Sequence, residues 1–340
     1  MMSTHEVREH YLSGKKIVVA GAGVAGLAFA ITLRKLWSPS VEPPVVVIYD
    51  RDAKEPSVGR EGYSLSLHGT DRDSGLYALK QLGLPNDIID LAIFRVQDRP
   101  MISVRAKAAA GIPTASIRIA RKVLRRVLAE AASASPEIRW GTACTLSAET
   151  DEECDILVAA DGASRACLRP DDKLRFAGPA RQHSLVWALG ILEAAPRPKR
   201  DNRDPQQAQE IIRQVRELGK GITEPFKTIL NATDPSTTLV LNAMDKRPFP
   251  HDMKAGPVLF IGYSNHAVSS FAGNGANLAL KDGNLDCAMA TYDRRSLPRA
   301  IATLESSHWR IKVGHATGLQ CWMYRIFFTT VGVVMTLLGR

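Results

Sequence analysis

Three glycines and one acid near the N-terminus have the types and the spacing to bind a ligand that carries phosphates. Gly21, Gly23 and Gly26 follow the apolar run Ile17–Ala20, and Asp50 stands 24 residues beyond Gly26. In such a turn the first glycine permits a tight bend, the second lets a pyrophosphate approach the backbone, and the third lets a helix pack closely on a strand. An acid at this distance can bind the hydroxyls of a ribose. The pattern predicts a site for a dinucleotide that contains adenosine, and it leaves NAD and FAD both open.

A strand, a helix and a second strand have to position these residues. The short apolar run Ile17–Ala20 is typical of a buried strand. After the turn, Leu27, Ala30 and Ile31 recur at helical spacing, and the N-terminus of such a helix presents N–H groups and a partial positive charge to phosphates. The β-branched run Val45–Ile48 predicts the second strand, which ends next to the acid. This order is that of a dinucleotide-binding α/β unit.

Basic residues lie on a helix expected further along the chain. Segment 116–132 has the pattern of a helix with its lead-in, and Arg121 opens its apolar periodicity. An Arg at the start of such a helix could contact a phosphate or a flavin, so Arg121 is a candidate site residue. For Arg125 and Arg126 we expect exposure to solvent.

Two more strands are followed by groups that suit the same kind of ligand. Asp161 follows the apolar run Ile156–Ala160, and an acid at the end of a buried strand lies at the sheet edge where ligands bind. The strand expected at Val258–Ile261 leads to the glycine-rich segment Gly273–Asn277, which opens another helix. A glycine turn into a helix N-terminus forms a site for an anion or a polarised carbonyl.

The composition is that of a globular protein and excludes several other classes. The chain has 340 residues, 45% hydrophobic and 23% charged, which is enough for a sizeable core. The net charge is +9, but the basic residues are scattered and not interleaved with aromatics. We therefore expect no nucleic-acid binding, whereas this charge suits phosphates and anionic substrates. The five cysteines show no metal-site spacing and predict neither a metal site nor a disulfide framework.

The two ends of the chain carry different signals. The polar N-terminus lacks an apolar signal core, so we expect a disordered leader over residues 1–14 and a cytoplasmic protein. The C-terminal segment Ile326–Leu338 is apolar for 13 residues, whereas a spanning helix needs roughly 20. Two interpretations stay open for it. We favour a terminal helix packed on the body, and the alternative is a patch for a membrane surface or a partner.

Together and in this order, these blocks resemble the FAD-dependent aromatic hydroxylase family of group A flavoprotein monooxygenases, in particular fungal members akin to the tetracycline-modifying monooxygenases. The matching blocks are the first glycine turn with Asp50, the segment Asp155–Arg165 and the segment Phe260–Asn277. Arg121 matches the family's Arg at the start of the helix before the third strand. The resemblance covers residues 15–310.

The resemblance implies that FAD is bound rather than NAD, with NAD(P)H as co-substrate and O2 as the oxidant. It places the first glycine turn at the pyrophosphate, Asp50 at the ribose, and Asp161 beside both FAD and NAD(P)H. The implied reaction hydroxylates or epoxidises a hydrophobic aromatic, polyketide-like or terpenoid-like molecule in secondary metabolism. The candidate cofactor-binding residues are Gly21, Gly23, Gly26, Asp50, Arg51, Arg60, Arg121, Asp161, Gly262, Gly273, Gly275 and Asn277.

One position departs from the family's pattern. The family carries Gly-Asp in its third block, and its Asp bonds the ribityl chain, whereas here Tyr263 follows Gly262. Losing a charge-assisted hydrogen bond costs roughly 1.5–3 kcal/mol. A second interpretation therefore stays open: a relative with the same fold but impaired FAD binding, acting without redox turnover as a cyclase, an isomerase or a binding protein. His266 is its candidate acid or base, and a structural histidine is the simpler interpretation.

The predicted fold is α/β, with an FAD-binding Rossmann-like (GR2-type) domain, a mixed β-sheet substrate domain and C-terminal helices. We assign residues 15–68, 116–165 and 255–296 to the FAD-binding domain. Residues 69–115 and 166–254 form the predicted covering domain, which includes a strand expected at 237–244. Residues 297–340 form the predicted helical tail.

Overall fold

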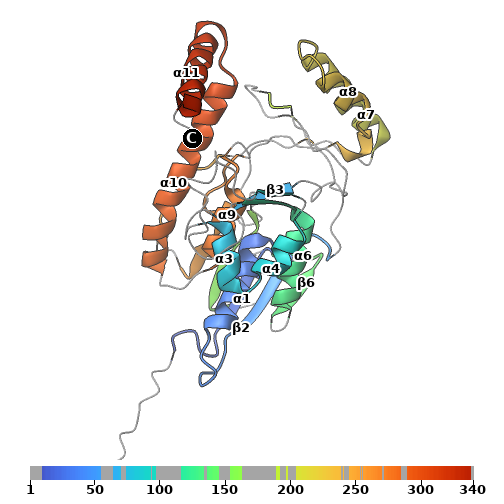
Figure 1. The fold of residues 1–340 in the computed structure, drawn as a ribbon. Helices are drawn as coiled ribbons and strands as arrows, with labels where there is room; N and C mark the ends of the chain where they lie inside the picture. Colours follow the sequence, from blue (N-terminus) through green and yellow to red (C-terminus); the bar gives the residue numbers. More distant parts are fainter. Residues whose placement is uncertain are drawn as a thin grey trace, which may run out of the picture.

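A five-stranded parallel sheet is the centre of the protein (Figure 1). The computed structural model describes residues 10–54, 64–69, 74–92, 94–96, 116–133, 136–144, 154–162, 189–191, 197, 204–238, 240, 245–252, 254, 256–269, 272–284 and 289–337. The strand order is β6-β2-β1-β7-β8, and every neighbouring pair is parallel. The strands are β1 (Lys16–Ala20), β2 (Val45–Asp50), β6 (Glu137–Trp140), β7 (Ile156–Ala159) and β8 (Val258–Phe260). This arrangement confirms the predicted α/β fold.

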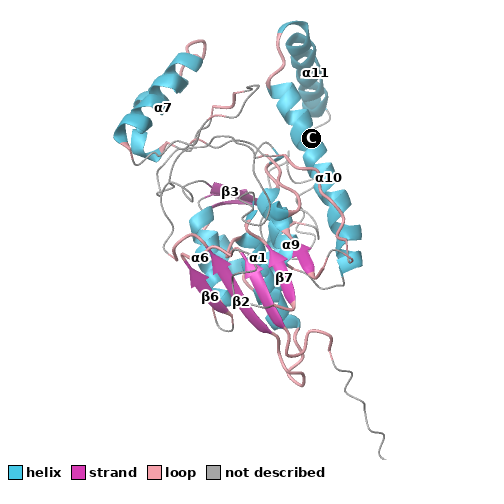
Figure 2. Ribbon diagram, turned by 180° about the vertical axis from the view of Figure 1, so that it is seen from behind, coloured by secondary structure: helices cyan, strands magenta, loops and turns pink. Residues whose placement is uncertain are grey.

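Helices cover one face of this sheet (Figure 2). They are α1 (Val24–Leu36), α3 (Gly75–Leu82), α4 (Pro85–Asp90), α6 (Arg121–Ala132) and α9 (Gly275–Gly283). Their apolar side chains form the largest core together with Ile17, Val19 and Ile48 of the sheet. Described residues on the opposite face form a smaller cluster around Val18 and Val47. Because successive residues of a strand point to opposite faces, β1 contributes to both cores.

Parallel pairing brings the predicted ligand-binding turns to one edge. The turns with Gly23, Asp161 and Gly262 all follow the carboxyl ends of strands in this sheet. Helix α9 lies against α1 so closely that a Cβ added at Gly283 would come within 2.6 Å of the Cβ of Ala28. Helices α1 and α9 therefore run side by side, and each begins after a glycine turn near this edge.

A three-stranded antiparallel sheet forms a second layer, in the order β3-β5-β4. Its strands are β3 (Ser64–His68), β4 (Phe94–Val96) and β5 (Ser116–Ala120). Strand β5 corrects the expected helix lead-in, because Ile117 and Ile119 are buried while Arg118 between them is exposed. That alternation is typical of a strand. The sheet combines segments from both predicted domains, and the domain division stays a prediction.

Three helical elements form a separate group: α7 (Pro205–Leu218), α8 (Phe226–Asn231) and η2 (Pro235–Thr237). In Figure 1, α7 and α8 stand away from the parallel sheet. The strand expected at 237–244 is wrong at its start, because Thr237 ends η2. The carboxylate of Asp234 accepts a hydrogen bond from the backbone N of Ser236 at 2.9 Å and favours this turn. Residues 241–244 lie outside the described residues.

Two long helices, α10 (Met289–Gly314) and α11 (Gly318–Leu337), end the described chain. They lie side by side in Figures 1 and 2, and the ring of Trp309 in α10 is 6.1 Å from that of Phe328 in α11. The expectation that the tail packs on the body is wrong, because Trp322 is 62% exposed and Phe327 is 55% exposed. In the described part of the chain, no helix combines the length and the apolar character needed to cross a membrane.

The predicted leader is described only in part. Residues 10–14 form turns in which the ring of His10 lies 4.5 Å from the ring of Trp37. Next to them, Lys15 forms an ion pair of 2.8 Å with Asp155. Residues 1–9 lie outside the described residues.

Candidate dinucleotide site

The first glycine turn has one open face. Gly21 has a φ of +113°, and a Cβ added there would lie 2.5 Å from the carbonyl oxygen of Ala160. A Cβ at Gly26 would collide with the carbonyl oxygen of Gly21 and lie 3.1 Å from Cγ1 of Val19. At Gly23, by contrast, the nearest atom would be 3.9 Å away. Close packing leaves no room for a side chain at Gly21 and Gly26. Gly23 is not enclosed in this way, and the lack of a side chain there leaves the backbone clear for a ligand.

Helix α1 begins without a side-chain cap. Its N-cap residue is Gly23, which has no side chain to accept hydrogen bonds from the first turn, and that turn contains no acid. The first N–H groups of a helix have no partner within the helix and carry a partial positive charge. The start of α1 therefore suits a pyrophosphate.

Asp50 is bonded to this turn. Its Oδ2 accepts a hydrogen bond from the backbone N of Ala22 at 2.8 Å, and its Oδ1 accepts one from Asp52 at 2.8 Å. The side chain is 12% exposed. These bonds hold the carboxylate at the end of β2 beside the open face of Gly23. The ribose contact assigned to Asp50 stays a prediction.

Arg125 is buried, which corrects the expectation of solvent exposure. Its Nε donates to the carbonyl oxygen of Ala22 at 3.1 Å, and its Nη2 lies 3.5 Å from Oδ2 of Asp50. The guanidinium also lies 4.7 Å from the ring centroid of Trp140. The cation stabilises both the turn and the carboxylate. Helical spacing was the signal that could have found it, because Arg125 shares the buried face of α6 with Leu128.

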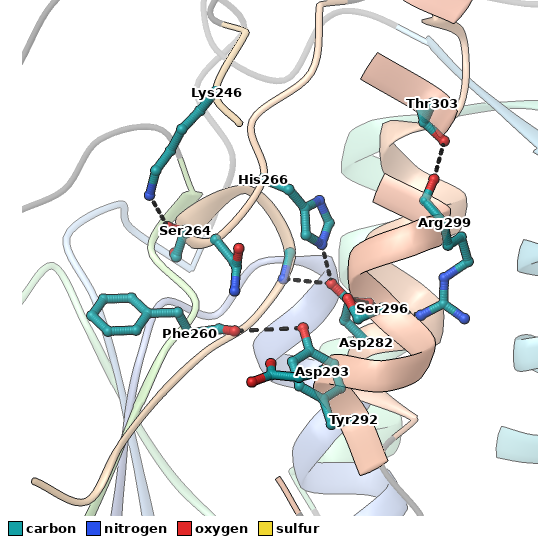
Figure 3. A network of polar contacts seen from close by, with 12 residues as sticks. Lys246, Phe260, Ser264, His266, Asp282, Tyr292, Asp293, Ser296, Arg299 and Thr303 are labelled. Atoms are coloured by element: carbon teal, nitrogen blue, oxygen red, sulfur yellow. Dashed lines mark hydrogen bonds and ion pairs between the residues drawn. The ribbon is translucent and has the colours of Figure 1, made fainter. Parts of the chain in front are cut away.

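The second and third sequence blocks are bonded to each other. The third block forms a short turn, η3 (Gly262–Ser264). The hydroxyl of Ser264 donates to Oδ1 of Asp161 at 3.0 Å and accepts a hydrogen bond from the backbone N of Gly162 at 3.2 Å. Lys246 donates to the carbonyl oxygen of Ser264 at 3.2 Å (Figure 3). Asp161 is therefore held at the sheet edge next to η3.

A buried carboxylate anchors η3 (Figure 3). Oδ2 of Asp282 accepts a hydrogen bond from the backbone N of Gly262 at 2.9 Å and contacts Nε2 of His266. Its Oδ1 accepts hydrogen bonds from Arg299 at 3.1 Å and Ser296 at 3.3 Å. Burial by itself would raise the pKa of Asp282, but His266, Arg299 and the N–H of Gly262 together outweigh it and lower that pKa to about 2. Sequence analysis did not identify Asp282. The signal that could have identified it was the presence of an acid on the apolar face of a helix.

His266 faces this carboxylate. Its side chain is 1% exposed and its Nε2 is directed at Asp282. A ring enclosed in this way positions the chain that follows η3. The geometry favours a structural role over the acid or base that the non-redox interpretation requires.

The start of α9 is tied to the second sheet. Oδ1 of Asn277 accepts hydrogen bonds from the backbone N of His68 at 2.8 Å and of Gly75 at 3.0 Å. Its Nδ2 donates to the carbonyl oxygen of Ser66 at 3.0 Å. The amide of Asn277 thus joins α9 to β3 and α3. Gly273 has a φ of +62°, the left-handed conformation that favours glycine.

Tyr263 lies on the second glycine turn. A Cβ added at Gly275 would collide with the hydroxyl oxygen of Tyr263 and would lie 2.6 Å from its Cε1. Gly275 is the first residue of α9. The side chain of Asn274, the N-cap residue, donates to Oγ1 of Thr303 at 3.0 Å and accepts no hydrogen bond from the first turn of the helix. The Tyr263 ring therefore covers the helix start at which the sequence predicts a cofactor contact.

Three arginines complete the predicted set. Arg121 is the first residue of α6 and is half-buried, and Arg51 is exposed just beyond β2. Arg60 lies outside the described residues.

The cofactor roles of all twelve predicted residues stay predictions. Among the described residues, no group of three or more His, Cys, Asp or Glu side chains could hold a metal ion.

Comparison with known proteins places this geometry in a family. No family model matches the chain. The monooxygenase cfoF from Aspergillus candidus is 38% identical over 393 residues, and the alignment covers 92% of this chain and 94% of cfoF.

Two solved structures share the fold. HpxO from Klebsiella pneumoniae, complexed with FAD and uric acid, gives a TM-score of 0.64 at 17% identity, covering 97% of this chain and 98% of HpxO. The tetracycline destructase Tet(51) gives a TM-score of 0.53 at 15% identity, covering 95% of this chain and 97% of Tet(51). Identities this low show the fold alone. The similarity to cfoF extends over nearly the whole of both chains, and this protein therefore belongs to the same family of monooxygenases, which are oxidoreductases, and has the fold of the FAD-complexed HpxO.

Proposed function

We propose that this protein is an FAD-dependent monooxygenase that uses NAD(P)H and O2 to hydroxylate or epoxidise a hydrophobic small molecule in secondary metabolism. One observation carries the proposal. The uncapped start of α1, with the open face of Gly23, lies beside the carboxylate of Asp50. These groups suit the pyrophosphate and the ribose of one adenine dinucleotide. Family membership favours FAD as that dinucleotide.

The described residues fit the ADP half of FAD. Gly23 and the first turn of α1 would hold the pyrophosphate, Asp50 would bind the ribose, and Arg125 would keep the carboxylate in place. When bound, FAD supplies the redox chemistry that takes a hydride from NAD(P)H and activates O2. The flavin half does not fit the start of α9 in this conformation, because the ring of Tyr263 lies on Gly275.

The names of two structural neighbours support a proposal for the substrate class. One solved neighbour is complexed with uric acid, and another is named a tetracycline destructase. Both names point to ring-containing small molecules. We therefore propose an electron-rich, ring-containing substrate for this protein.

The visible spectrum of the purified protein, recorded with and without added FAD, tests the proposed function. We expect flavin bands that bleach when NADPH is added without oxygen and return when oxygen is admitted. A protein that takes up no flavin at high FAD concentration would contradict the proposal.

A second candidate function is favoured by the position of Tyr263. A relative whose flavin end stays closed could bind or transform a substrate without redox turnover. Such a protein would be colourless and would oxidise no NADPH, yet it would still bind or convert a ring-containing small molecule. The spectrum therefore separates the two candidates.

We also propose that α11 rests on an anionic lipid surface. Its exposed apolar side chains include Leu319, Trp322, Met323, Ile326, Phe327, Phe328, Val331, Val333, Val334 and Leu337. Apolar surface of this extent is normally covered by protein or lipid. Residues 306–340 include no acid, whereas Arg310, Lys312 and Arg325 are positively charged. This charge favours anionic headgroups.

Sedimentation with vesicles tests the lipid contact. We expect binding to vesicles that contain phosphatidylserine, weaker binding to phosphatidylcholine alone, and a loss of about tenfold in Val334→Glu. Leu218→Glu on α7 is the matched control, because Leu218 and Val334 are both 46% exposed. Dimers without vesicle binding would contradict this proposal.

A further inference from the structure

The two glycine turns of the candidate site differ in what covers them. At the start of α1, an added Cβ on Gly23 would meet nothing closer than 3.9 Å. At the start of α9, an added Cβ on Gly275 would lie 2.6 Å from Cε1 and 2.7 Å from Cζ of Tyr263, and it would collide with the hydroxyl oxygen. One turn presents bare backbone, whereas an aromatic ring covers the other.

The Tyr263 ring is held on two sides. Its backbone belongs to η3, which Asp282 anchors through the 2.9 Å hydrogen bond from Gly262. Its half-buried ring packs against an apolar cluster of Val268, Ala272, Leu278 and Leu304. A tyrosine has only two side-chain torsions. The ring can therefore uncover Gly275 only by rotating about them and giving up contacts with this cluster.

We propose that Tyr263 closes the flavin end of this site. With the ring on Gly275, α1 can take the ADP half of FAD, but the isoalloxazine half reaches α9 only after the ring has moved away. The inference rests on the proposed function, in which α1 and α9 hold the two halves of one FAD molecule. Tyr263 then determines how much the flavin half of FAD adds to the binding affinity of the ADP half.

A comparison of FAD with ADP isolates this effect. ADP reaches only the α1 end, so its affinity is independent of Tyr263. FAD carries the same ADP group together with the flavin half, so the ratio of the two affinities reports the state of the α9 end. Calorimetric titration measures both ligands on the same full-length protein.

For the wild-type protein we expect FAD to bind within about threefold of the affinity of ADP. In Tyr263→Leu, we expect FAD to bind about tenfold more tightly while the affinity for ADP stays the same. Leucine keeps apolar contact with the Val268 cluster but is too short to cover Gly275. Tyr263→Ser removes more of the side chain and provides a second variant with the same expected direction.

Tyr263→Phe is the matched control, because it keeps the ring and removes only the hydroxyl. We expect it to retain the wild-type ratio of FAD to ADP affinity. A ratio that rises in Tyr263→Phe as much as in Tyr263→Leu would overturn the claim that the ring closes the site.

Two results separate the inference from the proposed function. If the wild-type protein binds FAD about a hundredfold more tightly than ADP, Tyr263 closes nothing, and the inference fails while the proposed function stands. If neither ligand binds the wild-type protein or the leucine variant, the dinucleotide site itself is wrong, and both fail. The wild-type measurement decides the first case even when a variant does not fold.

Discussion

The starts of α1 and α9 have the same local structure but different surroundings. Each helix follows a glycine turn, and neither has a side-chain cap from its N-cap residue. At α1 the neighbouring side chain is the carboxylate of Asp50, which bonds beside the turn and leaves Gly23 open. At α9 the neighbouring side chain is Tyr263, which covers Gly275. A glycine turn therefore offers a site only if the rest of the fold leaves its surface clear.

The acid beside the start of α1, Asp50, and the acid near the C-terminal end of α9, Asp282, also differ in their surroundings. Asp50 keeps 12% of its side chain exposed, and Arg125 holds it with one contact of 3.5 Å. Asp282 is fully buried, with contacts to His266, Arg299 and the backbone of Gly262. An acid that is still reached by solvent can bind a ligand, whereas a fully enclosed acid holds the chain in place. We expect the acid near α1 to act in binding and the acid in α9 to act in stability.

The largest expected effect is the loss of the α9 acid. Asp282→Ala removes a fully buried carboxylate from the half-buried Arg299, from His266 and from the backbone N of Gly262, and we expect the free energy of unfolding in urea to fall by about 3–5 kcal/mol. The matched control is Asp155→Ala, which removes an exposed ion pair with Lys15 and should cost far less stability. Equal losses in the two variants would remove the distinction between an enclosed and an exposed acid.

Low pH should destabilise the region around Asp282. The folded-state pKa of Asp282 is lowered from 3.8 to about 2, so the stability it contributes is present above pH 4 and is lost as the pH falls through 2. We expect a loss on the order of 2 kcal/mol across this range. Urea unfolding of the wild-type protein and Asp282→Asn at a series of pH values measures it. The gap between the two proteins should narrow as the pH falls, and a constant gap would contradict the assignment.

Because the ring of Tyr263 rests on Gly275, we expect substitutions at these two positions to have non-additive effects on stability. Gly275→Ala alone places a Cβ against the ring, and we expect it to lower the free energy of unfolding by about 1–3 kcal/mol. In the Tyr263→Leu background, Gly275→Ala should cost little, because the obstructing atoms are gone. Thermal unfolding of the four proteins in this cycle measures the coupling. Additive effects would show that the ring does not rest on Gly275.

The smallest expected change lies at α1. Gly23→Ala has room for its methyl group, so we expect an unfolding free energy within about 1 kcal/mol of the wild-type value and an affinity for ADP lowered by about tenfold. Gly221→Ala is the control, because Gly221 lies between α7 and α8 and an added Cβ there meets nothing within 4 Å. Calorimetric titration with ADP provides the comparison. Unchanged ADP affinity in Gly23→Ala would place the pyrophosphate elsewhere.

Local patterns predicted the dinucleotide unit because each of its parts obeys a short-range rule. Apolar runs of four or five residues predicted β1, β2 and β7, and the glycine spacing located the start of α1. In these cases the pattern that forms the element lies within the element itself.

The structure differs from the sequence predictions at residues whose environment depends on partners far away in the sequence. Residues 116–120 became a strand because β3 and β4 pair with them on both sides. Arg125 is buried because Ala22 and Asp50 supply its partners from more than seventy residues away. The apolar tail formed a helix, but the described body provides no surface that buries it.

The sequence by itself determined the α/β class, the glycine turn of α1 and the likeness to a flavoprotein family, since these depend on residue types at short spacing. Only the tertiary structure decided that Asp282 is enclosed by His266 and Arg299 and that the ring of Tyr263 lies on Gly275. Both depend on side chains brought together by the packing of α9 and α10 around η3. Burial and contact are properties of such packing, and the spacing of residues along the chain does not specify them.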